Sequence, residues 1–264
     1  MPDPIRVVVA GFGKLGAELA RGLARSPDIQ LVGVVRRSMA SSTLDIVGRS
    51  VPVGDDLNAM FEQARADALL EASLPAAVRS HVQAALERRI AVVVATSGVE
   101  ETFVQDLREA CPRNGTGVVI APNLSLGSIV ATHLAAIAGR FFDHADIIEM
   151  HREGKLDAPS GTALHTARVM AQTREGDFTR AETEKFTLPD VRGGALQGVG
   201  IHSIRLPGLI AHQQVIFGGL GQTLTIRHDT TSNESYVPGA ILALRHAVQS
   251  SELTVGLAAL LGLE

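Results

Sequence analysis

A short apolar, mostly β-branched run that leads straight into glycines constrains the fold of this 264-residue chain most strongly. The run Ile5–Ala10 is typical of a strand buried on both faces of a parallel sheet. Apolar positions then recur at helical spacing until Ser26-Pro27. Between strand and helix, glycines allow a tight turn, close approach of backbone N–H groups to a pyrophosphate, and close helix packing. We therefore predict a dinucleotide-binding loop, with a plain strand-to-helix turn as the alternative, at Gly11-Phe12-Gly13-Lys14-Leu15-Gly16.

Strand and helix patterns go on alternating through the first half of the chain. Short connections between such segments favour right-handed β-α-β units. This part therefore predicts a Rossmann-type, doubly wound parallel sheet. Further strands are expected over residues 30–35, 68–72, 90–95 and 117–121, and helices over 75–88 and about 100–110.

The pattern changes after Pro122-Asn123. Helices are expected over 126–141 and 162–172, strands over 147–150, 201–206, 212–217 and 222–228, and no clear periodicity over 175–200. A last helix at 237–249 and an apolar tail at 255–263 are expected to return to the first domain. The predicted class is α/β, with a dinucleotide-binding domain of residues 1–124 and 236–264 and an α+β domain of residues 125–235 built on an open mixed sheet.

Composition excludes several functions. Aromatic residues are scarce, with eight Phe, one Tyr and no Trp, and the net charge is −4, so nucleic acid is a poor partner. The single cysteine, Cys111, cannot form an internal disulfide or a Cys-based zinc site, and we expect no bound metal. No apolar run is long enough for a membrane span, and residues 1–6 lack a signal-peptide pattern, so we expect a cytoplasmic protein.

Two loops at the expected carboxyl edge of the sheet bear on the cofactor. Arg36-Arg37-Ser38 stands where an NAD-preferring domain usually has an acidic residue. Guanidinium groups suit a 2′-phosphate, so the sequence favours NADPH, although use of NADH and a merely solvated loop are both alternatives. Ala95-Thr96-Ser97-Gly98 ends another strand and either faces the nicotinamide or serves as ordinary turn and capping chemistry.

The segment from Glu149 to Ala163 carries most of the expected chemistry. Ser160, Gly161 and Thr162 place hydroxyl and backbone N–H groups at a helix start, which is a natural site for a carboxylate or phosphate. Arg152 and Lys155 add positive charge, and His151 or Lys155 can donate a proton next to a carbon that receives a hydride. Alone, each has a plainer interpretation as a structural histidine, a solvated charge or a helix cap.

This segment resembles a known family. Lys155-x-Asp157-Ala158-Pro159-Ser160-Gly161-Thr162-Ala163 is similar to the hallmark of the dihydrodipicolinate reductases, now called 4-hydroxy-tetrahydrodipicolinate reductases. The stretch from Ala121 through Asn123 and Leu124 to Gly127 resembles the family's hinge and nicotinamide-side segment. Residues 95–98 resemble its Gly/Ala-Thr-Thr-Gly loop, and residues 200–205, 216–219 and 224–228 resemble its C-terminal sheet, so the resemblance covers nearly the whole chain.

The resemblance implies an NAD(P)H-dependent reductase of lysine and diaminopimelate biosynthesis, a homotetramer held mainly through its C-terminal sheets. Its substrate is a cyclic dicarboxylate, and the hydride goes to an α,β-unsaturated imine formed by loss of water. By motif position, His151 and Lys155 correspond to the acid and substrate-binding pair. Ser160, Gly161 and Thr162 correspond to the carboxylate cradle, and Ser97 to a threonine near substrate and nicotinamide.

The sequence departs from the family in several places. Arg152 replaces the second of two adjacent histidines and can hold a carboxylate itself. Glu71-Ala72-Ser73-Leu74-Pro75 stands where Asp-Phe-Thr usually precedes the proline, Ser232-Asn233 replaces a Ser-Arg pair, and the glycine loop is one residue tighter. Two alternatives follow: a paralogous imine reductase or amino-acid dehydrogenase with another anionic substrate, and a non-catalytic NADPH-binding protein. Retention of His151 with Lys155 argues against the second, because binding alone needs no proton donor.

Overall fold

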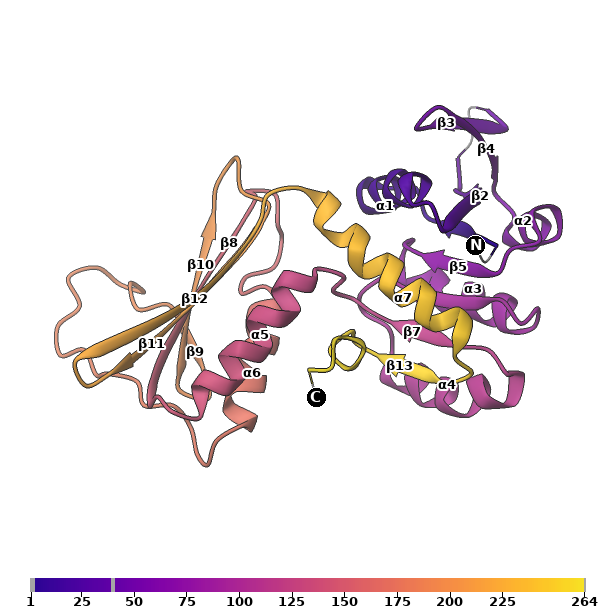
Figure 1. Ribbon diagram of the computed structural model, residues 1–264. Coiled ribbons are helices and arrows are strands. Elements are labelled where there is room, and N and C mark those ends of the chain that lie inside the picture. Colours follow the sequence, from indigo (N-terminus) through magenta and orange to yellow (C-terminus); the bar gives the residue numbers. More distant parts are fainter. Residues whose placement is uncertain (1–2, 39–40, 264) are drawn as a thin grey trace. The chain divides into compact units, whose positions relative to one another are not determined.

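The computed structural model describes residues 3–38 and 41–263 and divides into two compact units (Figure 1). The first unit holds residues 1–126 and 233–264, and the second holds residues 127–232. The predicted first domain includes residues 1, 2, 39, 40 and 264, which lie outside the described residues. No helix in the described part of the chain is long and apolar enough to span a membrane.

The first unit is built on an eight-stranded sheet with the order β13-β7-β6-β5-β1-β2-β4-β3. All neighbouring strands are parallel except β3 and β4, which form an antiparallel pair. The chain moves from β1 to β2 on one side and later to β5 on the other. In sheets of this kind a ligand binds outside the carboxyl ends of the strands at this switch point. The strands are β1 (Ile5–Ala10), β2 (Ile29–Val35), β3 (Thr43–Ile46), β4 (Arg49–Gly54), β5 (Ala68–Glu71), β6 (Ala91–Val94), β7 (Val118–Ile120) and β13 (Leu253–Val255).

Helices cover both faces of this sheet. Side chains of α2 (Leu57–Ala64), α3 (Pro75–Leu86) and α4 (Glu101–Asn114) share one buried core with the strands. On the other face, α7 (Val237–Gln249) packs on β5, β6 and β7 and contacts α1 (Lys14–Arg25). Short 3-10 turns, Asn233–Tyr236 and Ala259–Leu261, flank α7 and end the chain. The predicted doubly wound α/β sheet is therefore confirmed.

The second unit is a five-stranded mixed sheet with the order β12-β11-β8-β10-β9. β8 and β10 are parallel, and every other neighbouring pair is antiparallel. Figure 1 shows α5 (Leu126–Gly139) and α6 (Gly161–Gln172) together on one face of this sheet, where their side chains share a core with Ile147, Val215 and Phe217. The opposite face stays partly exposed. The strands are β8 (His144–His151), β9 (Gly194–Leu196), β10 (Val199–Arg205), β11 (Ala211–Gly219) and β12 (Gln222–Thr230).

Some elements lie where the sequence predicted none. β3, β4 and α2 occupy residues 43–64, and β9 lies inside the segment 175–200 that shows no periodicity. β3 and β4 form a short hairpin that turns through Val47 and Gly48, both with positive φ. β9 has three residues and lies at a sheet edge. Such short strands do not alternate for long enough to give a clear pattern.

Candidate active site

Two glycines of the glycine loop, Gly11 and Gly16, are required by the fold, whereas the third, Gly13, is not. A Cβ on Gly11, whose φ is +94°, would lie 2.4 Å from the carbonyl oxygen of Ala72, and one on Gly16 would lie 2.0 Å from that of Gly11. Gly13 has ordinary φ, and a Cβ there would meet nothing within 4 Å. Gly13 is also the N-cap of α1 and offers no capping side chain. The first N–H groups of α1 thus face open space beside a residue without a side chain, which fits a dinucleotide pyrophosphate.

Arginines follow the neighbouring strand, as predicted. The Arg36 guanidinium lies 5.9 Å from the centre of the Phe12 ring, so the end of β2 and the glycine loop are in contact. Lys14 and Arg37 are exposed, and Leu15 is half-buried. The structure therefore brings a positive group against the glycine loop on the β2 side of β1.

The loops after β6 and β7 hold their residues in different ways. Thr96 is buried and donates its hydroxyl hydrogen to the carbonyl of Ser73 at 3.3 Å, whereas Ser97 is exposed. The Asn123 side chain accepts a hydrogen bond from the backbone N–H of Ser125 at 2.9 Å. Three residues of these loops are apolar and buried, namely Ala95, Ala121 and Leu124. These residues could contact a ligand only through their backbone.

In the second unit, the predicted carboxylate cradle lies at the start of α6. Ser160 is the N-cap, and its hydroxyl oxygen accepts a hydrogen bond from the backbone N–H of Ala163 at 3.2 Å. By helix geometry, the N–H groups of Gly161 and Thr162 have no carbonyl partner inside the helix. A Cβ on Gly161 would meet nothing within 4 Å. As at Gly13, the open space lies beside unpaired backbone donors, which suits an anion.

Glu149 lies at the centre of this site and contacts its main residues, although the sequence motif indicated no role for it. It is fully buried at the end of β8. One carboxylate oxygen lies 2.5 Å from His151 Nδ1, and the other accepts the backbone N–H of Ser160 at 3.2 Å. Arg205 on β10 donates to both oxygens, at 2.7 and 3.0 Å. Alternation along β8 places Glu149 on the same face as buried Ile147, and this is the signal that could have identified it.

The surroundings of Glu149 keep it ionised. Burial by itself would raise its pKa, but hydrogen bonds from His151, Arg205 and Ser203 outweigh burial and lower the pKa to about 2. A carboxylate beside Nδ1 makes that nitrogen the hydrogen-bond donor. The other ring nitrogen of His151, Nε2, is then available to exchange a proton with a ligand.

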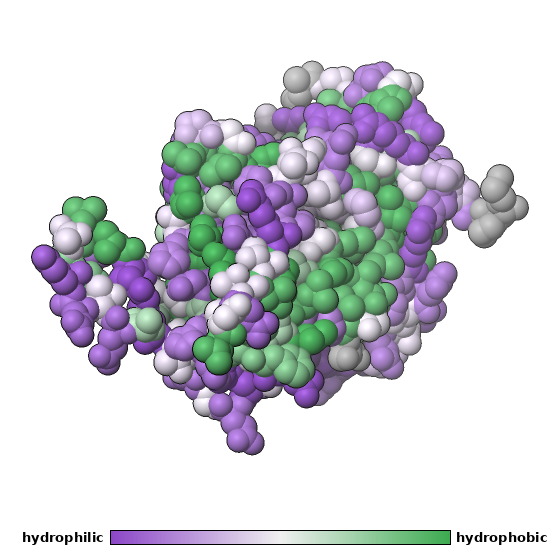
Figure 2. Space-filling view, turned by 60° about the vertical axis from the view of Figure 1, so that its left-hand side comes forward, coloured by the Kyte–Doolittle hydropathy of each residue, from purple (hydrophilic) through white to green (hydrophobic). Residues whose placement is uncertain are grey.

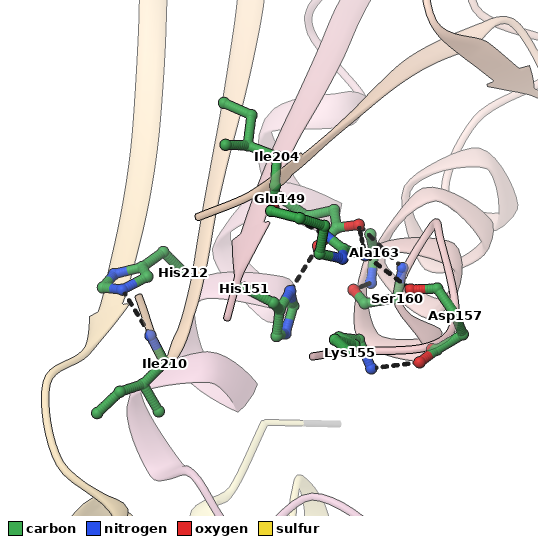
Figure 3. A network of polar contacts seen from close by, with 10 residues as sticks. Glu149, His151, Lys155, Asp157, Ser160, Ala163, Ile204, Ile210 and His212 are labelled. Atoms are coloured by element: carbon green, nitrogen blue, oxygen red, sulfur yellow. Dashed lines mark hydrogen bonds and ion pairs between the residues drawn. The ribbon is translucent and has the colours of Figure 1, made fainter. Parts of the chain in front are cut away.

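Lys155 joins the same group through two further residues. Its Nζ lies 2.7 Å from Asp157 Oδ1, and this hydrogen bond lowers the pKa of Asp157. The backbone carbonyl of Asp157 accepts a hydrogen bond from Arg205 at 2.7 Å. Continuous contacts therefore link Lys155, Asp157, Arg205 and Glu149 to His151 and Ser160. Figure 3 shows the side chains of Glu149, His151, Lys155, Asp157 and Ser160 grouped together.

Arg152 is not part of this network. Its side chain is exposed and makes no hydrogen bond or ion pair within the described part of the chain, while its carbonyl accepts the backbone N–H of Lys155 at 3.1 Å. Within the described residues there is also no cluster of three or more His, Cys, Asp or Glu that could hold a metal ion.

Comparison with known proteins identifies the family. Residues 5–124 match the family model for the N-terminus of dihydrodipicolinate reductase, and residues 125–261 match that for its C-terminus. The 4-hydroxy-tetrahydrodipicolinate reductase of Moorella thermoacetica is 40% identical over 262 residues, covering 97% of this chain and 98% of the relative. The Synechocystis enzyme of the same name is 41% identical over 271 residues, covering 98% of each.

Solved structures with a similar fold include a member of the same family. A dipicolinate-bound dihydrodipicolinate reductase from Paenisporosarcina sp. TG-14 superposes with a TM-score of 0.86 at 34% identity, covering 97% of this chain and 99% of that one. An amine dehydrogenase from Mycobacterium smegmatis has a TM-score of 0.64 at 12% identity, covers 94% of each chain, and shares the fold alone. The chain therefore belongs to the dihydrodipicolinate reductase family of nicotinamide-dependent oxidoreductases.

Proposed function

We propose that the residues linked through Glu149 form the substrate site of this reductase. As a member of its family, the protein reduces 4-hydroxy-tetrahydrodipicolinate, by way of dihydrodipicolinate, to tetrahydrodipicolinate in lysine and diaminopimelate biosynthesis. One observation carries the assignment of the site. A single buried carboxylate contacts both His151 and the backbone of Ser160, and so holds a proton-transfer group and an anion-binding helix start together.

The start of α6 binds one carboxylate of the substrate. The N–H groups of Gly161 and Thr162 and the Thr162 hydroxyl are its donors, and the positive end of the helix dipole adds to the attraction. The Ser160 hydroxyl oxygen accepts from Ala163, so its own hydrogen remains to be donated to the same carboxylate. Lys155 supplies a nearby positive charge. Its ammonium group, now paired with Asp157, can pair with a substrate carboxylate instead. The dipicolinate bound by the Paenisporosarcina enzyme is likewise a dicarboxylate.

His151 provides the proton. The reduced nicotinamide supplies the hydride when it is bound, and the adjacent substrate carbon needs one proton. Because Nδ1 donates to Glu149, a protonated His151 presents its second N–H, at Nε2, to the substrate. Through its contact with Nδ1, the Glu149 carboxylate holds the orientation of the ring before and after the transfer. Lys155 holds the substrate, and Ser97 keeps the substrate-binding role that its motif position implies.

NADPH is the preferred cofactor in this proposal. The first turn of α1 holds the pyrophosphate, and Arg36 and Arg37 hold the 2′-phosphate of the adenosine. Support comes from the contact of Arg36 with Phe12, which keeps one guanidinium beside the glycine loop. NADH, which lacks that phosphate, is the alternative.

A homotetramer assembled in the cytoplasm through the second sheet completes the proposal. Ile148, Met150 and Ile216 are half-buried and Ile204 is exposed on the sheet face opposite α5 and α6. Other exposed apolar side chains of this unit include Phe186, Leu188 and Leu206. Figure 2 shows hydrophobic side chains gathered into a broad green area on the face turned to the viewer. Exposed apolar surface of this kind marks an interaction site, and a second copy of the sheet would cover it.

The test is the oxidation of NADPH, followed by its absorbance, with substrate generated in place from pyruvate and aspartate semialdehyde by a coupling synthase. We expect robust activity in the wild type, a large loss of turnover in Lys155→Ala, and unchanged NADPH affinity in that variant. Pyridine-2,6-dicarboxylate should compete with the substrate. A wild type that binds NADPH but never oxidises it would overturn the proposal, and competition by other anionic imines would redirect it toward a different substrate.

A further inference from the structure

A second buried carboxylate lies in the first unit, at the carboxyl end of β5. Glu71 is fully buried, and in the sheet it lies between Ala10 of β1 and Val94 of β6. Both neighbours are apolar. Glu71 also begins the segment Glu71–Pro75, where the sequence departs from the family's common pattern. Nothing in the proposed chemistry uses this carboxylate.

The contacts of Glu71 hold the loop that follows it. One oxygen accepts the backbone N–H of Ser73 at 2.8 Å and also its hydroxyl hydrogen. The other oxygen lies 2.5 Å from Nδ1 of His81, whose side chain reaches down from α3 and is 23% exposed. Glu71 therefore ties the loop over residues 72–74 to α3.

The loop over residues 72–74 lies between the glycine loop and the loop after β6. On one side, the Ala72–Ser73 peptide lies so close to Gly11 that a Cβ there would be 2.6 Å from the Ser73 nitrogen. On the other side, the Ser73 carbonyl accepts the hydroxyl of Thr96, in the loop after β6. A shift of Ser73 would thus move both the glycine loop and the loop containing Ser97.

A gain in stability does not by itself explain why Glu71 and His81 are paired at the carboxyl end of β5. Burying a carboxylate costs desolvation energy, and a buried ion pair seldom stabilises a fold more than apolar residues of similar volume. What the pair gives is a fixed position for a short loop at the switch point, where the ligand of such a sheet binds.

We propose that Glu71, with His81 and Ser73, is a positioning residue for the nicotinamide half of the cofactor. The inference rests on the proposed cofactor placement. Arg36 and Phe12 place the adenosine on the β2 side of β1, so the loops after β5 and β6, on the other side of β1, receive the nicotinamide half. Glu71 acts through Ser73 and does not itself contact the cofactor.

The test compares a whole dinucleotide with its adenosine half. Glu71→Gln keeps the shape but removes the charge, and Ser73→Ala removes the hydroxyl contact without leaving a large cavity. We expect the Kd of NADPH, measured by titration calorimetry, to rise about tenfold in Glu71→Gln and less in Ser73→Ala. The Kd of adenosine 2′,5′-bisphosphate, which has no nicotinamide, should stay unchanged in both.

Val82→Ala is the matched structural control. Val82 neighbours His81 on α3 and is fully buried, so this variant destabilises the helix without touching the carboxylate. An equal loss of affinity for NADPH and for the adenosine fragment would overturn the inference. So would an unchanged NADPH Kd in Glu71→Gln, or a similar rise in Val82→Ala at a comparable thermal midpoint. Reductase activity of the wild type reports on the proposed function separately, because it does not depend on these comparisons.

Discussion

Replacement of Glu149 by Gln removes the charge at the centre of the substrate site while keeping its shape. No rotation of the new amide restores the contacts. One carboxylate oxygen faces Arg205 and the Ser160 N–H, and the other faces Arg205 and His151. In either orientation, the NH₂ group meets at least one N–H donor of Arg205. The variant therefore leaves the guanidinium of Arg205, whose side chain is only 18% exposed, without its ionised partner.

The cost follows from the pKa of Glu149. Its hydrogen bonds hold the pKa at about 2, against an ordinary value of 4.5. That difference corresponds to about 3 kcal/mol of interaction with the ionised form. Loss of one partner from a buried ion pair typically costs about 3–5 kcal/mol, so the two routes agree in size. We expect Glu149→Gln to lower the free energy of unfolding by about 3 kcal/mol at pH 7.

The pH dependence has a definite sign. A carboxyl whose pKa is lowered on folding stabilises the protein above its unfolded pKa, and this stabilisation disappears as pH falls toward the folded pKa. The difference between wild type and Glu149→Gln should therefore be largest above about pH 5. By about pH 3 roughly half of it should be gone.

Urea unfolding of the wild type and the variant at several pH values measures this difference. Turnover should also fall about a hundredfold or more, because the proton donor loses its orienting partner. Glu153→Gln, an exposed carboxylate in the same loop, is the control and should change neither quantity. A difference in unfolding free energy below about 1 kcal/mol at pH 7, or an equal effect in Glu153→Gln, would refute the reasoning.

Three further predictions test other parts of the structure. Replacing Arg36 and Arg37 together by Ala should raise the Kd of NADPH far more than that of NADH; an unchanged preference between the two in a binding titration would remove both arginines from the phosphate site. Gly161→Ala should weaken competition by pyridine-2,6-dicarboxylate without loss of thermal stability, because the added methyl enters open space within the protein; unchanged inhibition would place the carboxylate elsewhere. Cys111 is buried, and burial raises the pKa of its thiol to about 11, so a thiol reagent should label it only as the protein unfolds, and rapid labelling of the native enzyme would contradict this.

The sequence predicted those parts of the fold whose pattern is local and long. β1 and α7 lie where it predicted them, residue for residue in the case of Val237–Gln249. α6 was predicted from residue 162 and begins one residue earlier, at Gly161, with Ser160 as its N-cap. β3 and β9 were missed because short edge strands have little periodicity.

The polar network of the site was less accessible to sequence reasoning. Arg205 and Glu149 are 56 positions apart in the chain and meet because β10 lies beside β8 in parallel register. Strand pairing of this kind cannot be deduced from spacing. Glu149 itself could have been identified, because it alternates with buried Ile147 along β8, but its partners Arg205 and Ser160 are found only once the sheet and α6 are assembled.

The order in which the two units can fold during synthesis follows from the way the chain crosses twice between them. The second unit ends at residue 232, whereas the first unit is completed by α7 and β13, near the end of the chain. Ala240, Ala243, Leu244 and Ala247 are fully buried, and α7 packs on β5, β6 and β7. During translation, therefore, the inserted unit can finish folding while the earlier one still lacks a helix on its sheet. The nascent protein must carry that uncovered apolar face until the last thirty or so residues emerge, and this interval is when it is most exposed to aggregation and most dependent on chaperones.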